Sequence, residues 1–493
     1  MKKQKILAIA TFCAAVVLIL LYFFVISPVL LAEDPADTEE TQKPLENEVI
    51  NESGRTLLFP HYERESIQSI EIYNSNGKYT VYRNAEDTFV LNGFEELSLD
   101  PTVLSSVIVG AGYSITMNRI TEEAEDLSEY GLDPEKDDPA WYRLTTIDEK
   151  QYKVYIGKKL VSDAGYYVCL EDSRAVYTIT NSLLDTMFLG KENIAAKQIT
   201  TTIASTDMMK VTKFAVMKGE DTVVSVKSIT EAEAESLGLD INYQLVVPKG
   251  YNLNVTTYTA ALECFSSFEA TEIAAIGITK SKLEKFGLTG APYSIYFELN
   301  GEETYLTVSE KTEDGKYYVA SHNNDVIGVY PAESLPFLET DVIRWVDQSI
   351  YMVNINEIAE IKIESNRVNE TFTLEGEGQE LIVTTSEGLK PDVKNFRQFY
   401  KTLLSTYIQG YSELSDEEIE AAKSKEPQLT FTYTTRAGKT TVYQFYTISE
   451  RKSICVIDGE GGEFYYLYTH ANKISSDCIK IINGEPVDSE DRN

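Results

Sequence analysis

Pairs of adjacent tyrosines are the residues of this chain best suited to binding chemistry. The three pairs are Tyr166 with Tyr167, Tyr317 with Tyr318, and Tyr465 with Tyr466. Tyrosine combines a large apolar ring with a hydroxyl group, and it is enriched where proteins bind partners. Neighbouring side chains on a strand point to opposite faces, so only one tyrosine of each pair can share a surface. We expect core packing and a solvent-facing strand edge, with a stacking surface for a glycan or peptide as the alternative.

The histidines and the acidic runs do not have the spacing of a metal or catalytic site. His61 and His470 are isolated, and the third histidine lies in Ser321–Asp325, whose Asn and Asp residues favour a turn. The runs Glu122–Asp126 and Asp416–Glu418 lack the EF-hand pattern, and acids suit the first turn of a helix. The sequence has no G-x-S-x-G, P-loop or H-E-x-x-H motif. We therefore assign no catalytic, metal-binding or cofactor-binding residue.

Five scattered cysteines, without a C-x-x-C motif, indicate neither a zinc site nor a disulfide framework. Cys455 and Cys478 are the pair nearest in sequence that could bridge. Because free cysteine is among the residues most often buried, we expect two buried thiols, with a disulfide as the alternative.

The net charge of the chain excludes one class of partner. The formal charge is −34, and since residues 1–31 carry three lysines and no acid, the remainder carries −37. So acidic a body does not neutralise phosphates, and we therefore expect no nucleic-acid partner.

An apolar stretch near the N-terminus predicts a membrane-spanning helix. Residues 6–26 carry no charge, and a helix of that length spans a hydrocarbon core of about 30 Å. Lysines precede the stretch and acids follow it, which predicts a single-pass plasma-membrane protein with a cytoplasmic N-terminus and an extracytoplasmic body. A cleaved signal peptide, cut near Ala32, is the alternative. The residues assigned to the anchor include Ile6, Leu7, Val16, Leu20, Phe24 and Ile26.

The next segment, residues 32–59, reads as an acidic linker. Its first part, residues 32–54, has two prolines, eight acids and no apolar period. Such a composition is typical of an extended, charged chain.

Three similar segments follow, and they predict three copies of one α+β unit. Each copy opens with alternating apolar and polar residues, at Ile67–Tyr73, Val211–Met217 and Ile358–Glu364. The first run turns at Asn76-Gly77, a pair that predicts a type I′ hairpin with positive φ at both residues. A third strand and then a capped helix follow in each copy. We expect each unit to pack an antiparallel sheet against one or two helices, since one sheet face must be covered.

The second half of the unit begins with a Y/F-G-L motif after a short helix, and four further strands follow. Glycine in this motif suits the left-handed residue that ends a helix. The motif residues are Tyr130, Gly131, Leu132, Phe286, Gly287 and Leu288. The third copy has Ser415–Ala422 instead and is divergent. The predicted domains are residues 60–199, 200–346 and 347–486, with a loose tail at 487–493.

These motifs resemble the bacterial family called domain of unknown function 4340. The resemblance rests on Tyr130-Gly131-Leu132, Gly157, Gly165-Tyr166-Tyr167 and Val176-Tyr177, with weaker matches in the second copy. It implies one N-terminal membrane helix and, for some members, a role as auxiliary component near multidrug or gliding-type ABC export systems. It supplies no catalytic residue.

The leading expectation is therefore a membrane-anchored extracytoplasmic binding or scaffold protein, an accessory of an ABC-type export system or another envelope complex. Its expected partners are the bilayer and an ABC-type permease. One alternative is a cell-surface hydrolase that acts on wall polymer through an unlocated pair of carboxylates. Another is ligand capture in a tyrosine-lined groove between units.

Overall fold

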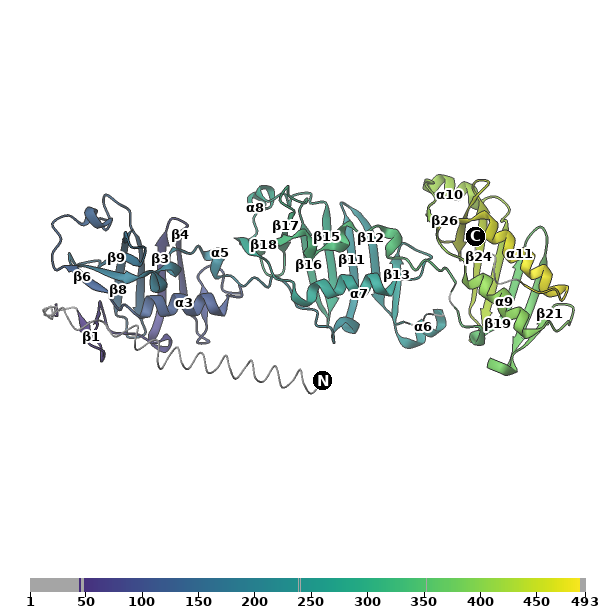
Figure 1. The fold of residues 1–493 in the computed structure, drawn as a ribbon, viewed down its shortest axis with the longest axis horizontal. Helices are drawn as coiled ribbons and strands as arrows, with labels where there is room; N and C mark the ends of the chain where they lie inside the picture. Colours follow the sequence, from purple (N-terminus) through teal and green to yellow (C-terminus); the bar gives the residue numbers. More distant parts are fainter. Residues whose placement is uncertain (1–43, 46–47, 238, 240, 352, 488–493) are drawn as a thin grey trace.

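The computed structural model describes residues 44–45, 48–237, 239, 241–351 and 353–487. Within these residues the chain forms three eight-stranded antiparallel sheets, arranged in a row and each accompanied by helices (Figure 1). The predicted mixed α+β fold with repeated antiparallel sheets is therefore confirmed. The predicted anchor, residues 6–26, lies outside the described residues. Among those that are described, no helix combines the length and the apolar character needed to cross a membrane.

The first unit is the sheet β3–β10 with its helices. Its strands are β3 (Ile67–Asn74), β4 (Gly77–Arg83), β5 (Phe89–Leu91), β6 (Asn118–Thr121), β7 (Ala140–Thr146), β8 (Gln151–Lys159), β9 (Gly165–Leu170) and β10 (Val176–Thr180). Its helices are α3 (Pro101–Gly112), α4 (Asn181–Leu184) and α5 (Lys191–Ile194), with the 3₁₀ turns η3 (Leu127–Tyr130) and η4 (Asp185–Phe188). Asp100 caps α3, because its carboxylate accepts hydrogen bonds from two backbone N–H groups of the first turn.

The second unit is the sheet β11–β18 with its helices. Its strands are β11 (Val211–Lys218), β12 (Asp221–Ser228), β13 (Tyr243–Val247), β14 (Glu272–Ile276), β15 (Tyr293–Leu299), β16 (Glu302–Val308), β17 (Lys316–Ser321) and β18 (Val326–Pro331). Its helices are α6 (Glu231–Leu237), α7 (Val255–Glu263) and α8 (Lys280–Lys285).

The third unit is the sheet β19–β26 with its helices. Its strands are β19 (Ile358–Glu364), β20 (Asn369–Glu375), β21 (Ile382–Thr385), β22 (Gly410–Tyr411), β23 (Leu429–Thr435), β24 (Thr440–Thr447), β25 (Lys452–Ile457) and β26 (Phe464–Leu467). Its helices are α9 (Val393–Leu404), α10 (Asp416–Lys423) and α11 (Tyr468–Ile482).

All three sheets have the same strand order. The first is β5-β4-β3-β7-β8-β9-β10-β6, and the other two repeat this order with their own strands. The chain thus builds one edge of the sheet first, passes through the main helix (α3, α7 or α9), and then adds a strand at the opposite edge. The sequence patterns predict seven strands per unit and miss this eighth one, which in the third unit is only the two residues Gly410–Tyr411.

Each sheet buries both faces, but unequally. One face packs on the main helix and belongs to a large apolar cluster that runs through all three units. The reverse face carries a smaller cluster made by the short helix of the second half-unit. Alternation along a strand produces this division: Val168 of β9 belongs to the large cluster, and its neighbour Cys169 to the small one.

Several local features differ from expectation. The first hairpin turns at Ser75-Asn76, and of Asn76 and Gly77 only Gly77 has a positive φ (105°). The sequence patterns predict that each copy closes on a short apolar segment, such as Leu183–Phe188, but the third unit closes on the 15-residue helix α11. The end of the predicted linker is folded, because Val49–Ile50 pairs with Thr56–Leu57 and the following residues are buried. The domain boundaries that we derived from the patterns stay predictions.

The cysteines follow the favoured interpretation. Cys455 and Cys478 are free and buried, as is Cys169. Burial raises the pKa of the Cys478 thiol to about 12, so this group stays protonated and unreactive near neutral pH.

Candidate functional site

The paired tyrosines do not converge on one surface. Tyr166 packs on Phe188 and donates a hydrogen bond to Asp185, whereas Tyr167 packs on Tyr130 across the sheet's other face. In the second unit Tyr317 is buried, and Tyr318 packs on Phe286 with a centroid distance of 4.8 Å. In the first two units one tyrosine of the pair, Tyr167 or Tyr318, therefore completes the small cluster beneath the Y/F-G-L motif. In the third unit Tyr466 belongs to the large cluster, and the ammonium of Lys452 lies 4.2 Å from the ring centroid of Tyr465.

The glycines of that motif end their short helices as predicted. Gly131 has φ of 72° and follows η3, and Gly287 has φ of 67° and follows α8. Leu132 and Leu288, the third residues of the motif, are buried in the small clusters. The motif residues Tyr130, Gly131, Leu132, Phe286, Gly287 and Leu288 therefore hold a short helix against the sheet.

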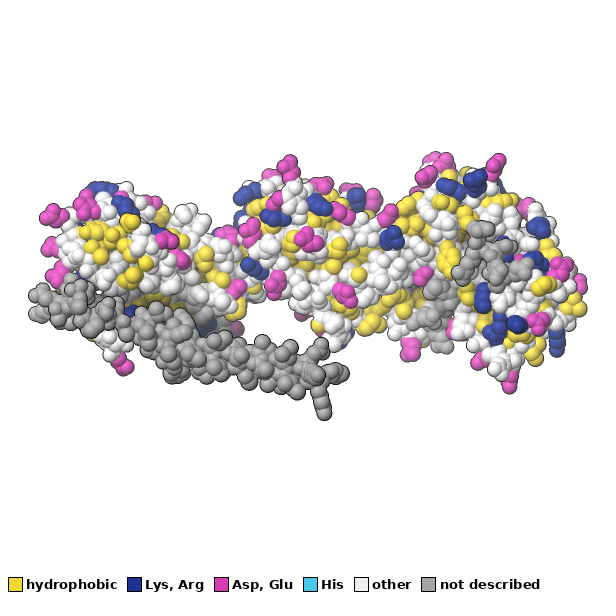
Figure 2. All heavy atoms as spheres, viewed as in Figure 1, with side chains coloured by type: hydrophobic (Ala, Val, Ile, Leu, Met, Phe, Trp, Pro, Cys, Tyr) yellow, Lys and Arg dark blue, Asp and Glu magenta, His cyan; other side chains and the backbone are white. Residues whose placement is uncertain are grey.

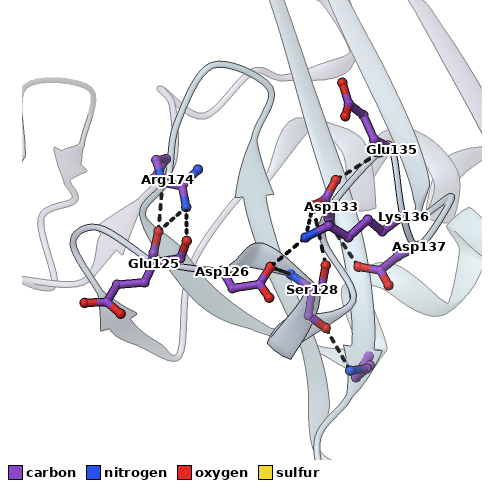
Figure 3. Close-up of polar contacts among 10 residues, drawn as sticks. Glu125, Asp126, Ser128, Asp133, Glu135, Lys136, Asp137 and Arg174 are labelled. Atoms are coloured by element: carbon purple, nitrogen blue, oxygen red, sulfur yellow. Dashed lines mark hydrogen bonds and ion pairs between the residues drawn. The ribbon is translucent and has the colours of Figure 1, made fainter.

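Asp126 and Asp133, which flank the first motif, are matched by cations and N–H groups of the chain itself (Figure 3). Lys136 forms ion pairs with Asp126 (3.3 Å) and Asp133 (3.2 Å), and Arg174 donates hydrogen bonds to the backbone carbonyls of Ala124 and Glu125. Backbone N–H donation from Ser128 and the Lys136 ammonium lower the pKa of Asp126. The described residues contain no metal-binding group of three or more acids, histidines or cysteines. This loop is stabilised internally and offers no free ligand set.

The histidines are also accounted for by local contacts. His470 Nε2 lies 2.9 Å from Thr406 Oγ1 and 3.0 Å from the Thr402 carbonyl, and burial lowers the pKa of its imidazole. His61 lies 3.8 Å from Glu63 at the surface. The imidazole of His470 also lies near Lys473 and Asp477, which form an ion pair at 3.1 Å.

The strongest candidate site is at the junction of the second and third units. The loop between β13 and α7 inserts Tyr251 into the third unit, where its ring packs on Phe464 at 4.9 Å. Its hydroxyl donates to Glu463 Oε2 (2.7 Å) and accepts from the Gly462 N–H (3.0 Å). The connection that follows Trp345 pairs with the same loop, since the Asp347 N–H donates to the Asn252 carbonyl (2.8 Å). These contacts fix the two units at one side of the junction.

A cavity of about 220 Å³ lies beside this anchor, walled by both units. The β13 strand, the Tyr251 loop and the first turn of α7 form one wall, and β23, β24 and the end of β25 form the other. Most of its lining is aliphatic or aromatic. The lining includes Tyr243, Tyr251, Ile350, Tyr433, Lys439, Thr441, Tyr443, Ile457, Asp347 and Asp458.

The tyrosines of the cavity are held in place by hydrogen bonds to backbone. Tyr243 Oη donates to the Met208 carbonyl (3.0 Å), and Tyr443 Oη to the Ile350 carbonyl (3.2 Å). All four cavity tyrosines are at most 8 % exposed. Their rings therefore form a preorganised apolar wall, and the hydroxyls of Tyr243, Tyr251 and Tyr443 are engaged elsewhere.

The charged groups of the cavity differ in how they are satisfied. Asp347 Oδ1 accepts from the Ser349 N–H (2.9 Å), and Asp458 Oδ1 from the Val442 N–H (2.8 Å). Lys439 is half-buried and, within the described part of the chain, forms no ion pair; desolvation lowers the pKa of its ammonium, partly opposed by the charge of Asp458. Thr441 lies opposite Tyr433 on the paired strands, and its buried Oγ1 has no hydrogen-bond partner among the described residues.

None of these cavity residues is a predicted site residue. The sequence suggests a tyrosine-lined groove between units only as a general alternative. The two walls are about 190 residues apart in the chain, and no local motif joins them. The one available signal is alternation: Lys439, Thr441 and Tyr443 fall on one face of the β24 region, which places a lysine in line with buried residues.

Comparison with known families agrees with the resemblance seen in the motifs. Residues 90–290, which contain both Y/F-G-L motifs, match the family described as "Domain of unknown function (DUF4340)". The match runs from the third strand of the first unit into the middle of the second. Neither a curated protein nor a solved structure matches the chain.

Proposed function

We propose that this protein is a membrane-anchored extracytoplasmic binding protein, with its ligand site in the cavity between the second and third units. In this proposal it serves as an accessory of an envelope complex, with an ABC-type permease as the expected partner. The observation that carries the proposal is the preorganised cavity at a junction of two units. Junctions between domains are preferred positions for ligand sites, because both sides contribute walls.

The position of the cavity links binding to shape. A ligand that contacts both walls stabilises one relative placement of the two units over others, by as much as its affinity differs between them. A partner that contacts both units can then distinguish the occupied protein from the empty one. A binding accessory of a membrane complex requires such a difference.

The acids of the cavity favour binding over hydrolysis. A wall hydrolase needs two carboxylates placed on either side of the scissile bond. Asp347 and Asp458 each commit one oxygen to a backbone N–H that shapes the cavity rim. We therefore assign them a structural role in the proposed site.

Two measurements test the proposal. Chemical cross-linking in intact membranes, followed by affinity purification of the tagged full chain, is expected to yield one membrane protein at fixed stoichiometry. Recovery of the chain as a lone monomer under several gentle detergents would contradict the accessory role. Replacing Ile457, which lines the cavity, by Trp is expected to fill the space and to weaken ligand binding without releasing the anchor at Tyr251. Unchanged binding would move the site elsewhere.

A further inference from the structure

We infer that the cavity between the second and third units takes a small amphiphile with an apolar body and one anionic head, and that Lys439 holds the head. The inference rests on the proposed binding function and adds the chemical class of the ligand. It depends on three features of the cavity: its size, its lining and its one unpaired cation.

The size of the cavity limits the ligand to a small molecule. An engineered cavity of about 150 Å³ holds benzene, and pockets for drug-sized molecules measure about 300–1,000 Å³. The volume here is about 220 Å³. By this scale, a ligand of about ten non-hydrogen atoms fills it.

The lining selects an apolar body. Aliphatic side chains from both units face the space, and the buried tyrosine hydroxyls that are already bonded to backbone offer no new hydrogen bonds. A sugar hydroxyl that faces this aliphatic surface would lose its hydration without gaining a hydrogen bond, which costs about 1–3 kcal/mol per unpaired group.

The unpaired polar groups select the charge of the head. Lys439 and Thr441 follow the same strand face, and both hold donors without a partner among the described residues. The carboxylates of Asp347 and Asp458 each accept one backbone hydrogen bond through Oδ1. Lys439 is the one cation among the lining residues, and an anion can accept hydrogen bonds from its ammonium and offset its desolvation. A carboxylate or a phosphate monoester provides such an anion.

Three eight-carbon probes that differ only in the head group test the inference. They are octanoate, octylammonium and 1-octanol, and octyl phosphate separates a phosphate from a carboxylate preference. The full chain is used in phospholipid nanodiscs, with empty nanodiscs as the blank. In a Trp141→Phe background the emission comes from Trp345, which is buried and two residues from Asp347. We expect saturable binding of octanoate or octyl phosphate at least tenfold tighter than of the other two probes.

Substitutions of Lys439 and of a nearby exposed lysine test whether the charge of Lys439 itself binds the anionic head. Lys439→Met is expected to weaken binding of the anionic probe at least tenfold and to leave 1-octanol unchanged, and Lys439→Arg is expected to retain binding. Lys249→Met is the matched control, because Lys249 lies at the same junction but is exposed, 3.9 Å from Glu460. Unchanged melting temperatures of the controls show that the fold is kept.

The outcomes distinguish this inference from the proposed function. Tighter binding of octylammonium or 1-octanol than of either anion, abolished by Ile457→Trp, overturns the anionic head and leaves the cavity as a binding site. Octanoate binding that survives Lys439→Met also overturns the role of Lys439. No saturable response to any probe contradicts both proposals.

Discussion

The two junctions between units use the same loop of the fold but different residues. In the first unit the loop between β5 and α3 places Phe94 against Gly277, the residue that follows β14 of the second unit. In the second unit the equivalent loop, between β13 and α7, places Tyr251 against Gly461 of the third, and the Gly462 N–H donates to the Tyr251 hydroxyl. In both cases an aromatic side chain contacts a glycine with positive φ. This glycine lies near the sheet edge that the next unit completes after its main helix.

The difference lies in how each ring is fixed. Phe94 is half-buried, and the ammonium of Lys191 lies 5.0 Å from its centroid. Tyr251 is 8 % exposed, and its hydroxyl makes two hydrogen bonds inside the third unit. The second junction is therefore anchored at a defined point, with the cavity beside that point. The Tyr251 contacts hold the second and third units in a defined arrangement, and the cavity beside them can bind a ligand without breaking these contacts.

The largest expected effect comes from removing the second anchor. Tyr251→Ala deletes a buried ring and leaves Glu463 and the Gly462 N–H without their partner, so we expect a loss of about 3–5 kcal/mol in the free energy of unfolding. Calorimetry should show the third unit melting separately. Tyr251→Phe, which keeps the ring, should cost about 1–2 kcal/mol. Equal costs for both variants would show that the hydroxyl, and not the ring, fixes the junction.

The next effect tests the close approach at the first junction. A Cβ on Gly277 would lie 2.7 Å from Phe94 Cε1, and its φ of 72° disfavours any side chain. Gly277→Ala should therefore cost about 2–3 kcal/mol in urea denaturation. Gly219→Ala is the control, since Gly219 also has positive φ but has open space around it, and about 1 kcal/mol is expected. Equal losses at both positions would contradict the contact with Phe94.

A smaller effect is expected from the first ring itself. Phe94→Ala removes a half-buried side chain, and we expect a loss of about 1–2 kcal/mol, less than for Tyr251→Ala. In this background Gly277→Ala should lose most of its steric cost, which a double-mutant cycle measures. Strict additivity of the two changes would show that the residues do not interact.

The smallest effect concerns the cavity. Lys439 carries a pKa lowered by desolvation, so its charged form destabilises the folded protein below the folded pKa. This penalty disappears as pH rises through the folded pKa to the unfolded value of about 10.4. Without ligand, Lys439→Met should raise the melting temperature by about 1–3 °C at pH 7, and the difference should vanish above pH 10.4. A variant less stable than the parent at pH 7 would contradict the unpaired state of this lysine.

The sequence reveals those parts of the fold that depend on local patterns. Alternation places β3 at its observed start, Ile67, and the left-handed glycines at Gly131 and Gly287 follow from helix-end chemistry. The strand Gly410–Tyr411 is too short to show a period, since its pairing depends on the neighbouring strand β26. The apolar residues Ala471, Ile474, Cys478 and Ile481 recur at helical spacing in α11, so the helix can be predicted from the sequence. Alignment of the three copies hides it, because the other two units have no equivalent helix.

The cavity is the feature least accessible from sequence. Its walls come from β13 and from the β23–β24 hairpin, which meet only because the Tyr251 loop docks the third unit. Apolar residues that line a cavity look like core residues in any pattern. Lys439 is informative only when its neighbours Thr441 and Tyr443 are known to be buried.

Each unit adds an edge strand, β6, β14 or β22, after its main helix, on the opposite side of the sheet from its first strands. This arrangement affects how the units join. Every unit thereby has two unlike edges, and each junction joins the edge that one unit builds before its main helix to the edge strand that the next unit adds after its own (Figure 1). The row of three bodies seen in Figure 2 therefore has a direction. Duplication of one unit lengthens such a row by the width of eight strands, about 38 Å, without requiring a new kind of joint. The reach of the molecule can thus change in fixed steps while the residues at its two ends stay the same.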